Sequence, residues 1–212
     1  MRGLAVDTSA YLSDPCGTLS IPCWKALQIR IPEHMRIVHD REFDASLLNL
    51  YTDEAYFRLR HDLQQPVQAA PGYVVRTAGE ADLPLMAQII NRSYTDLSVT
   101  QDQLAGYRRT PAFAEDLWIL LLDARTRAPV GCGITDFDPE MREGVLEWIQ
   151  VLPEARGRGA GQALVGELLR RLAGRADFAT VSGKVHNPTH PERLYRRCGF
   201  TGSDVWHILT KR

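Results

Sequence analysis

The sequence has little of what marks membrane, disulfide-rich or nucleic-acid-coating proteins. Its longest uninterrupted apolar run, Leu117–Leu122, is far shorter than the roughly 18 residues that a membrane-spanning helix needs. The four cysteines show neither CxxC spacing nor histidines at zinc-finger intervals, and a net charge of −1 lacks the basic excess of a DNA-binding protein. The opening residues hold no apolar block of a secretory signal. We therefore expect a cytoplasmic protein with free thiols and with no metal, membrane or nucleic-acid partner.

What is present is an ordinary globular composition of 212 residues, 44% hydrophobic and 24% charged. Residues 64–72 contain two prolines and a glycine and indicate a linker, which divides the chain into an N-terminal extension, 1–70, and a main domain, 71–212. The extension is irregular over Tyr11–Pro32. Helical spacing of apolar residues then predicts an amphipathic helix over Asp44–His61.

The main domain reads as an alternation of strands and helices. Thr77 and Glu80 have the spacing of a capping box, which predicts a helix reaching about Ser93. Short connections between three successive apolar strands predict an antiparallel meander. The pattern as a whole predicts an α/β fold with a mixed, mostly antiparallel sheet flanked by helices. The expected strands are 73–76, 117–123, 130–136, 144–152, 179–185 and 205–210, and the expected helices are 77–93, 101–109, 161–173 and 190–197.

The most informative segment is the connection between the strand at 144–152 and the helix at 161–173. It contains three alternate glycines, Gly157, Gly159 and Gly161, directly before the helix. Glycine allows backbone N–H groups to turn toward a ligand, and the first amides of a helix suit an anion. Arg156 and Arg158 add positive charge at the same place. The alternative is an ordinary tight turn.

Two common nucleotide motifs are excluded at this turn. A Walker loop needs Gly-Lys-Ser/Thr, whereas the single Gly-Lys pair of the chain, at 183–184, is followed by Val185. A dinucleotide-binding GxGxxG needs a glycine where the chain has Gln162 or Leu164.

What the turn does contain is Arg156-x-x-Gly159-x-Gly161 after a strand. This resembles the acetyl-CoA loop of the GNAT superfamily of N-acetyltransferases. A second segment, Leu194-Tyr195 through Gly199-Phe200 preceded by Asn187-Pro188, is similar to the Asn…Leu-Tyr-x-x-x-Gly-Phe signature of the same family. Asn187 lies eight residues before Tyr195 where the family usually has seven, which implies a longer loop. The resemblance covers about residues 73–212.

The resemblance implies a GNAT-like fold with acetyl-CoA as co-substrate. In that family the backbone of the strand before the loop binds the pantetheine arm, and the loop amides bind the diphosphate. The implied cofactor-binding residues are Ile149, Val151, Arg156, Gly157, Arg158, Gly159, Ala160, Gly161 and Asn187.

Two side chains are candidates for the chemistry. Strand alternation predicts that Glu147 shares a face with Val145, Ile149 and Val151, where a glutamate serves many GNAT enzymes as a base acting directly or through water. The alternative for Glu147 is an ion pair with a neighbouring strand. Tyr195 is the candidate acid for the departing thiolate, and its alternative is packing under the sheet.

The leading hypothesis is therefore an N-acetyltransferase that acts on a primary amine of a small molecule or peptide. The alternative is a non-catalytic acyl-CoA-binding regulatory module, because a loop of this kind binds the ligand whether or not chemistry follows. The extension at 1–70 is expected to pack on the main domain, where it either walls the acceptor site or forms a homodimer contact.

Overall fold

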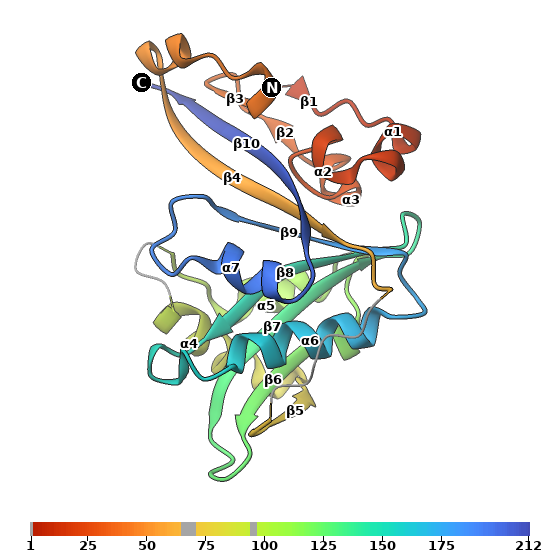
Figure 1. The fold of residues 1–212 in the computed structure, drawn as a ribbon, viewed down its shortest axis with the longest axis vertical. Helices are drawn as coiled ribbons and strands as arrows, with labels where there is room; N and C mark the ends of the chain where they lie inside the picture. Colours follow the sequence, from red (N-terminus) through yellow and green to blue (C-terminus); the bar gives the residue numbers. More distant parts are fainter. Residues whose placement is uncertain (1, 65–70, 94–96) are drawn as a thin grey trace. The chain divides into compact units, whose positions relative to one another are not determined.

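The computed structural model describes residues 2–64, 71–93 and 97–212. The chain folds into two compact units (Figure 1). The first comprises residues 1–61, 180–196 and 200–212, and the second comprises 62–179 and 197–199. The boundary expected near residue 70 falls partly outside the described residues, and the division into 1–70 and 71–212 stays a prediction. No helix of the described part is both long and apolar enough to cross a membrane.

The first unit combines the N-terminal residues with the C-terminal strand. Strand β10 pairs antiparallel with both β3 and β4, and the strand order is β3-β10-β4-β9. Its helices are α1 (Thr8–Ser13), α2 (Pro15–Thr18), α3 (Cys23–Ala26) and α7 (Pro191–Arg197), with 3-10 turns η1 (Asp40–Glu42) and η2 (Ala45–Asn49). Its strands are β1 (Arg2–Gly3), β2 (Arg30–Ile31), β3 (Met35–His39), β4 (Tyr51–His61), most of β9 (Phe178–Lys184) and β10 (Thr201–Lys211).

The helix predicted over Asp44–His61 is wrong. The structure has a short 3-10 turn followed by β4, which lies beside β10 along most of its length (Figure 1). From Tyr51 to Ala55 partly buried and exposed residues alternate, which is the period of a strand. Cross-strand packing against β10 decides the conformation, because aromatic and β-branched residues such as Tyr51 and Thr52 fit a half-buried sheet.

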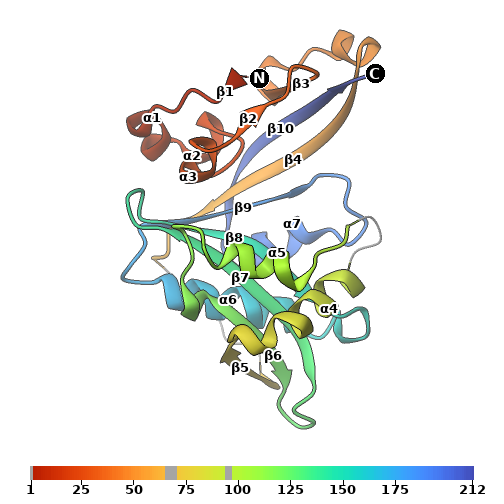
Figure 2. The same ribbon diagram turned by 180° about the vertical axis from the view of Figure 1, so that it is seen from behind.

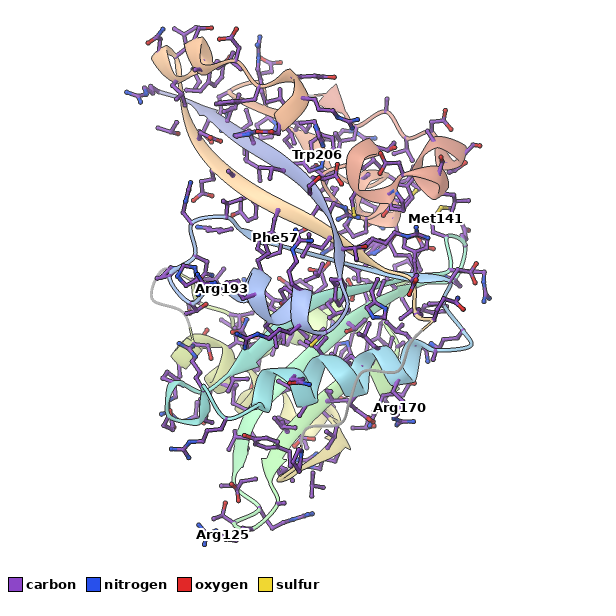
Figure 3. All side chains as sticks on the ribbon, in the orientation of Figure 1. Phe57, Arg125, Met141, Arg170, Arg193 and Trp206 are labelled. Atoms are coloured by element: carbon purple, nitrogen blue, oxygen red, sulfur yellow. The ribbon has the colours of Figure 1, made fainter. Side chains whose placement is uncertain are left out.

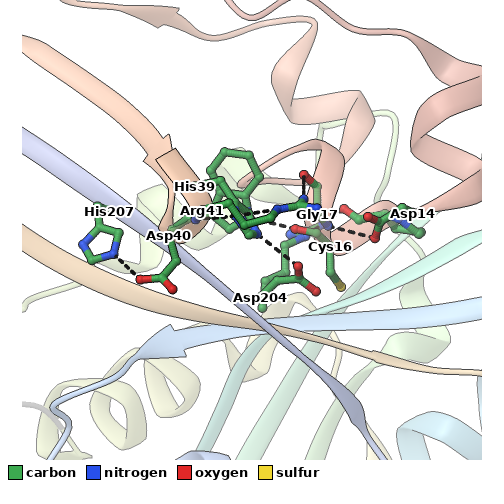
Figure 4. A network of polar contacts seen from close by, with 11 residues as sticks. Asp14, Cys16, Gly17, His39, Asp40, Arg41, Asp204 and His207 are labelled. Atoms are coloured by element: carbon green, nitrogen blue, oxygen red, sulfur yellow. Dashed lines mark hydrogen bonds and ion pairs between the residues drawn. The ribbon is translucent and has the colours of Figure 1, made fainter. Parts of the chain in front are cut away.

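A polar network joins β10 to the turn after β3 (Figure 4). The His207 ring is buried, with Nδ1 at 2.8 Å from Asp53 Oδ2 and Nε2 at 3.1 Å from Asp40 Oδ1. Its face stacks on Phe43 with the ring centres 3.9 Å apart. These contacts tie η1 and β4 to the last strand of the chain.

A second histidine lies beside this network. His39 Nδ1 accepts hydrogen bonds from the backbone N–H and the Nε–H of Arg41, both at 3.1 Å (Figure 4). With Nδ1 accepting, Nε2 carries the proton and donates it to Asp204 Oδ1 at 3.0 Å. The ring meets Trp206 edge-on, and the Trp206 indole donates to the Cys16 carbonyl at 2.7 Å. The N-terminal helices are thereby attached to β10.

The second unit contains the antiparallel strand order β8-β7-β6-β5. Its strands are β5 (Tyr73–Thr77), β6 (Trp118–Asp123), β7 (Pro129–Asp138) and β8 (Glu143–Val151). Its helices are α4 (Leu83–Ser93), α5 (Gln101–Tyr107) and α6 (Ala160–Leu172), with 3-10 turns η3 (Glu80–Asp82), η4 (Glu115–Leu117) and η5 (Pro153–Ala155). The predicted α/β class, with mostly antiparallel strands flanked by helices, is confirmed.

Helix α6 lies very close to β7 and β8 because glycines face it. A Cβ atom on Gly131 would lie 3.2 Å from the Leu164 side chain, and one on Gly133 would lie 2.9 Å from Leu168. A Cβ atom on Gly144 would collide with Leu172. The three leucines follow one another at every fourth position of the helix, so the whole apolar stripe of α6 rests on this row of glycines. The opposite side of the helix is solvated, and Arg170 points outward there (Figure 3).

The other face of the same strands is covered by α4 and α5 (Figure 2). The core on this face combines residues of both helices with the inward side chains of β6 and β7. Burial raises the pKa of the Cys132 thiol in this core to about 12, so the thiol stays protonated at neutral pH. All four cysteines are buried, and none of them forms a disulfide. The core members are Ala78, Leu83, Met86, Ala87, Ile89, Ile90, Val99, Leu104, Trp118, Leu120, Cys132, Ile134 and Leu152.

The N-cap of the η3–α4 segment is Gly79, two residues after the predicted cap, Thr77. Asp82 accepts a hydrogen bond from the Gly79 amide at 2.9 Å, and the Arg76 guanidinium donates to both of its oxygens at 2.6 and 2.7 Å. Thr77, predicted as the cap, instead accepts from Arg171 of α6 at 2.9 Å. The Arg76 hydrogen bonds, with help from Gly79, hold the pKa of Asp82 below its ordinary value against the opposing effect of burial.

This lowered pKa predicts how stability responds to acid. The Asp82 carboxylate stabilises the fold fully above its ordinary pKa near 3.8, and this contribution is lost as the pH falls through the lower, folded-state value. Replacing Asp82 with Asn should therefore reduce the free energy of unfolding by about 1–2 kcal/mol at pH 7. In denaturant titrations the difference from the wild type should vanish in acid. The exposed neighbour Glu80, changed to Gln, serves as the control and should change neither value.

Candidate functional site

The turn between β8 and α6 is built on two glycines in the left-handed region. Gly157 has φ +75°, and Gly159 has φ +86° and is the N-cap of α6. Side chains with a Cβ rarely adopt this conformation, so the turn requires glycine at both positions. Helix α6 begins at Ala160, one residue before the predicted start, which places Gly161 inside its first turn.

The N-terminus of α6 has no side chain capping it. The Ala163 amide donates to the Gly159 carbonyl at 3.0 Å, which is the first bond of the helical series, and Gly159 offers no side-chain acceptor. The amides of the first helical turn therefore have no partner within the helix. They stand at the positive end of a 13-residue helix, beside the exposed side chain of Arg158. Such an end suits an anion with several oxygens.

Arg156, an exposed residue, braces the turn through its side chain. Its Nε donates to the Val151 carbonyl at 3.1 Å, and its Nη2 donates to the Ser93 carbonyl at 3.3 Å. One arginine thus links the end of β8 and the end of α4 to the glycine turn. The role predicted for Arg156, contact with the diphosphate, stays a prediction, and this bracing role is one that the motif did not indicate.

Ser93 is a further residue that the sequence did not single out. Its hydroxyl donates to the Ile89 carbonyl at 2.8 Å and lies 3.4 Å from the Val151 carbonyl. The Val151 carbonyl therefore faces both Ser93 and Arg156. Ser93 ends an ordinary amphipathic helix, and no local pattern marks it as a contact of a strand so distant in the sequence.

Strand β8 carries a bulge at Glu147. Trp148 is opposite Ile134 on β7 whereas Leu146 is opposite Thr135, so Glu147 is an extra residue with no opposite partner. A bulge bends its strand and re-aims the side chain at that position. Glu147 is half-buried at this bend.

The bulge corrects part of the sequence prediction. Val145 is opposite Asp136, and Ile149 is opposite Gly133; since 133 and 136 lie on opposite faces of β7, so do Val145 and Ile149. Strict alternation had predicted that Val145 and Ile149 lie on one face together with Glu147. Ile149 and Val151, opposite Gly133 and Gly131, do share a face, which is the face of α6.

Two predicted site residues belong to the first unit. Tyr195 on α7 is 7% exposed, and its ring centre lies 5.7 Å from that of Phe200 and 6.3 Å from that of Phe57. The Asn187 side-chain oxygen accepts from the Thr189 amide at 2.9 Å and from its hydroxyl at 2.8 Å. Asn187 therefore shapes its own loop. In the second unit, Glu147, Ile149 and Val151 lie along β8, and Arg156 links Val151 to the glycine turn.

Metal chemistry has no visible ligand set here. Among residues 2–64, 71–93 and 97–212, no three or more His, Cys, Asp or Glu side chains gather as ligands of an ion would.

The bracing role of Arg156 can be tested by comparing a substitution of Arg156 with the same substitution of Arg158. Replacing Arg156 with Ala removes two hydrogen bonds from a charged donor and should lower the free energy of unfolding by about 1 kcal/mol. Amide hydrogen exchange, followed by mass spectrometry, should become faster in peptides covering 151–163. Arg158→Ala, which removes an equal charge from the same turn, should leave the exchange unchanged; equal effects of the two substitutions would contradict the role.

The chain is similar to known proteins over the same elements. Residues 114–202, which include β8, the glycine turn and α6, match the family model described as an acetyltransferase (GNAT) domain. No curated protein matches the chain.

Solved structures support the same fold. A GCN5-related N-acetyltransferase from Sphaerobacter thermophilus aligns with a TM-score of 0.65 at 19% identity, over 88% of this chain and 64% of that protein. The ribosomal-protein-S18-alanine N-acetyltransferase of Escherichia coli aligns with a TM-score of 0.52 at 18% identity, over 66% of this chain and 93% of that protein. The chain thus spans less than two thirds of the Sphaerobacter protein. Residues 114–202 of the chain thus match a GNAT acetyltransferase domain, and the chain shares the fold of solved GNAT structures.

Proposed function

We propose that the chain transfers the acetyl group of acetyl-CoA to a primary amine of a small molecule or peptide. The observation that carries the proposal is the uncapped N-terminus of α6, with Gly159 in the left-handed conformation, immediately after the bulged strand β8. Acetyl-CoA is the co-substrate of the family. Its diphosphate carries the negative charge and the acceptor oxygens that the amides of the first turn of α6 can bind.

In this proposal the backbone binds the co-substrate. The amides from Gly157 to Gly161 hold the diphosphate, with Arg156 fixing the turn and Arg158 adding charge. Main-chain groups of Ile149 and the N–H of Val151 face the pantetheine arm, because the Val151 carbonyl already accepts from Arg156 and Ser93. Asn187 contacts the arm from its own loop. A helix end by itself stabilises an exposed charge by only about 0.3–1 kcal/mol, so several amides must act together.

The reaction needs a neutral amine. A lysine-like amine with a pKa near 10.4 costs roughly 4.6 kcal/mol to deprotonate at pH 7, whereas an α-amine near 8 costs about 1 kcal/mol. We assign proton removal to Glu147, because the bulge sets this carboxylate apart from the regular strand. The neutral amine nitrogen bonds to the thioester carbon. The tetrahedral intermediate then loses a proton from this nitrogen to solvent, the carbon–sulfur bond breaks, and Tyr195 gives its proton to the departing thiolate and regains one from water.

The binding step can be tested with a matched pair of glycines. Gly159 and Gly174 have φ +86° and +81°, so Ala strains each backbone about equally, but Gly174 follows the far end of α6. We expect both substitutions to destabilise the fold by about 1 kcal/mol. In calorimetry with CoA, Gly159→Ala should weaken binding at least tenfold and Gly174→Ala should not. Wild type that releases no heat with millimolar CoA would refute the proposal.

The chemical step is tested separately from binding. Glu147→Gln should reduce kcat by 10²-fold or more for a lysine-type amine and much less for an α-amine, because the latter is largely neutral without a base. Tyr195→Phe should slow transfer without abolishing it, because a thiol of pKa near 8.5 leaves readily. Release of CoA is the readout, across a panel of amines. A wild type that binds CoA but acetylates no amine of the panel favours the non-catalytic module.

A further inference from the structure

The environment of Arg108, which follows α5, is unusual for an arginine. Its side chain is only 16% exposed. The guanidinium carbon lies 4.6 Å from the ring centre of Phe113 and 5.7 Å from that of Trp118. The ion pair of its Nη2 with Glu115 is 3.6 Å long, beyond hydrogen-bond distance, and Glu115 is 68% exposed. A largely buried cation therefore has a loose and solvated counter-ion.

Two hydrogen-bond donors in this cluster are unused. Neither Arg108 Nη1 nor Trp118 Nε1 has a hydrogen-bond partner in the described part of the chain, although both atoms are buried. A buried donor left without an acceptor costs about 1–3 kcal/mol. Trp118 is fully buried in the core, whereas the Arg108 side chain keeps part of its surface exposed, so the arginine is the group that an incoming molecule can reach.

Trp118, one member of this cluster, lies directly across the sheet from the bulge of β8. Trp118 on β6 is opposite Ile134 on β7, and Ile134 is opposite Trp148 on β8, the residue after Glu147. These three side chains share the face covered by α4 and α5. Trp118 and Trp148 are two strand spacings apart, which is about 10 Å. This spacing separates the Arg108 cluster from the bulge by about the length of a short peptide, although the buried Trp118 and Ile134 leave no passage across the core itself.

We propose that Arg108 binds a carboxylate of the acceptor, so that the acceptor is an amine that also carries a carboxyl group, such as a short peptide with a free C-terminus. The inference rests on the proposed acetyl transfer. A carboxylate matches the planar fork of a guanidinium with two parallel hydrogen bonds, and it supplies the charge that the distant Glu115 supplies poorly. Glu115 is the ion-pair partner of Arg108 in the structure, and in this proposal the acceptor carboxylate replaces it.

The experiment compares dipeptides as free acids with the same dipeptides as C-terminal amides. In the wild type, kcat/KM should be at least about tenfold higher for the acid, as for a charge-assisted pair. Arg108→Gln should bring the acid-to-amide ratio close to one. Glu115→Gln should act in the opposite direction and raise kcat/KM for the acid two- to fivefold with the amide unchanged. Arg109→Gln, at the exposed neighbouring position, is the control and should leave the ratio as in the wild type.

A second measurement separates this proposal from the transfer itself. If no dipeptide is acetylated although CoA binds, the proposed function fails; the Trp118 indole resonance, assigned with Trp118→Phe, then tests Arg108 alone. It should shift with the free acid but not with the amide, and Arg108→Gln should abolish the shift. If Arg108→Gln unfolds at a lower temperature than the wild type, Arg108→Lys is used in its place. This variant should lower the acid-to-amide ratio of kcat/KM at least threefold. A wild-type ratio near one, a ratio unchanged by these variants, or an unshifted indole overturns the proposal.

Discussion

The contact between the leucine stripe of α6 and the glycines of β7 and β8 sets the geometry of the second unit. Gly131, Gly133 and Gly144 have no Cβ, so the helix approaches the sheet more closely than it could over any other residue. Interiors are close-packed, and a helix that is seated at three levels has no freedom to slide. The position of the first turn of α6, and therefore of the amides that have no partner within the helix, follows from packing that extends to the far end of the helix.

The parts of the fold that could be predicted from the sequence were those whose signals are local. Glycine spacing before an amphipathic helix fixed the turn at 157–161 to within one residue, and short connections between apolar runs indicated the meander. The strand β4 was mistaken for a helix because its partner, β10, lies at the other end of the chain and no local pattern reveals it. The bulge at Glu147 was missed for a related reason: one extra residue is defined only by the register of β7, which the β8 sequence does not contain.

Two arginines of the second unit show how a motif and a function can differ. Arg156 belongs to the recognised pattern, yet its Nε and Nη2 already donate to the carbonyls of Val151 and Ser93. Arg108 belongs to no pattern, and its buried Nη1 has no hydrogen-bond partner in the described part of the chain. The type and spacing of residues indicated where an anion could bind. The hydrogen bonds that each guanidinium already makes then show which arginine still has N–H groups available for an anion.

The pairing of β4 with β10 has a consequence for how the protein is made. Residues of β4 are synthesised well before β10, the strand that pairs with them and that carries His207 and Trp206. Until β10 has been made, β4 lacks this partner along one edge, and its aromatic residues are without some of their final neighbours. An exposed strand edge of this kind is a site where chains readily aggregate, and a chaperone that covers it would protect the nascent chain.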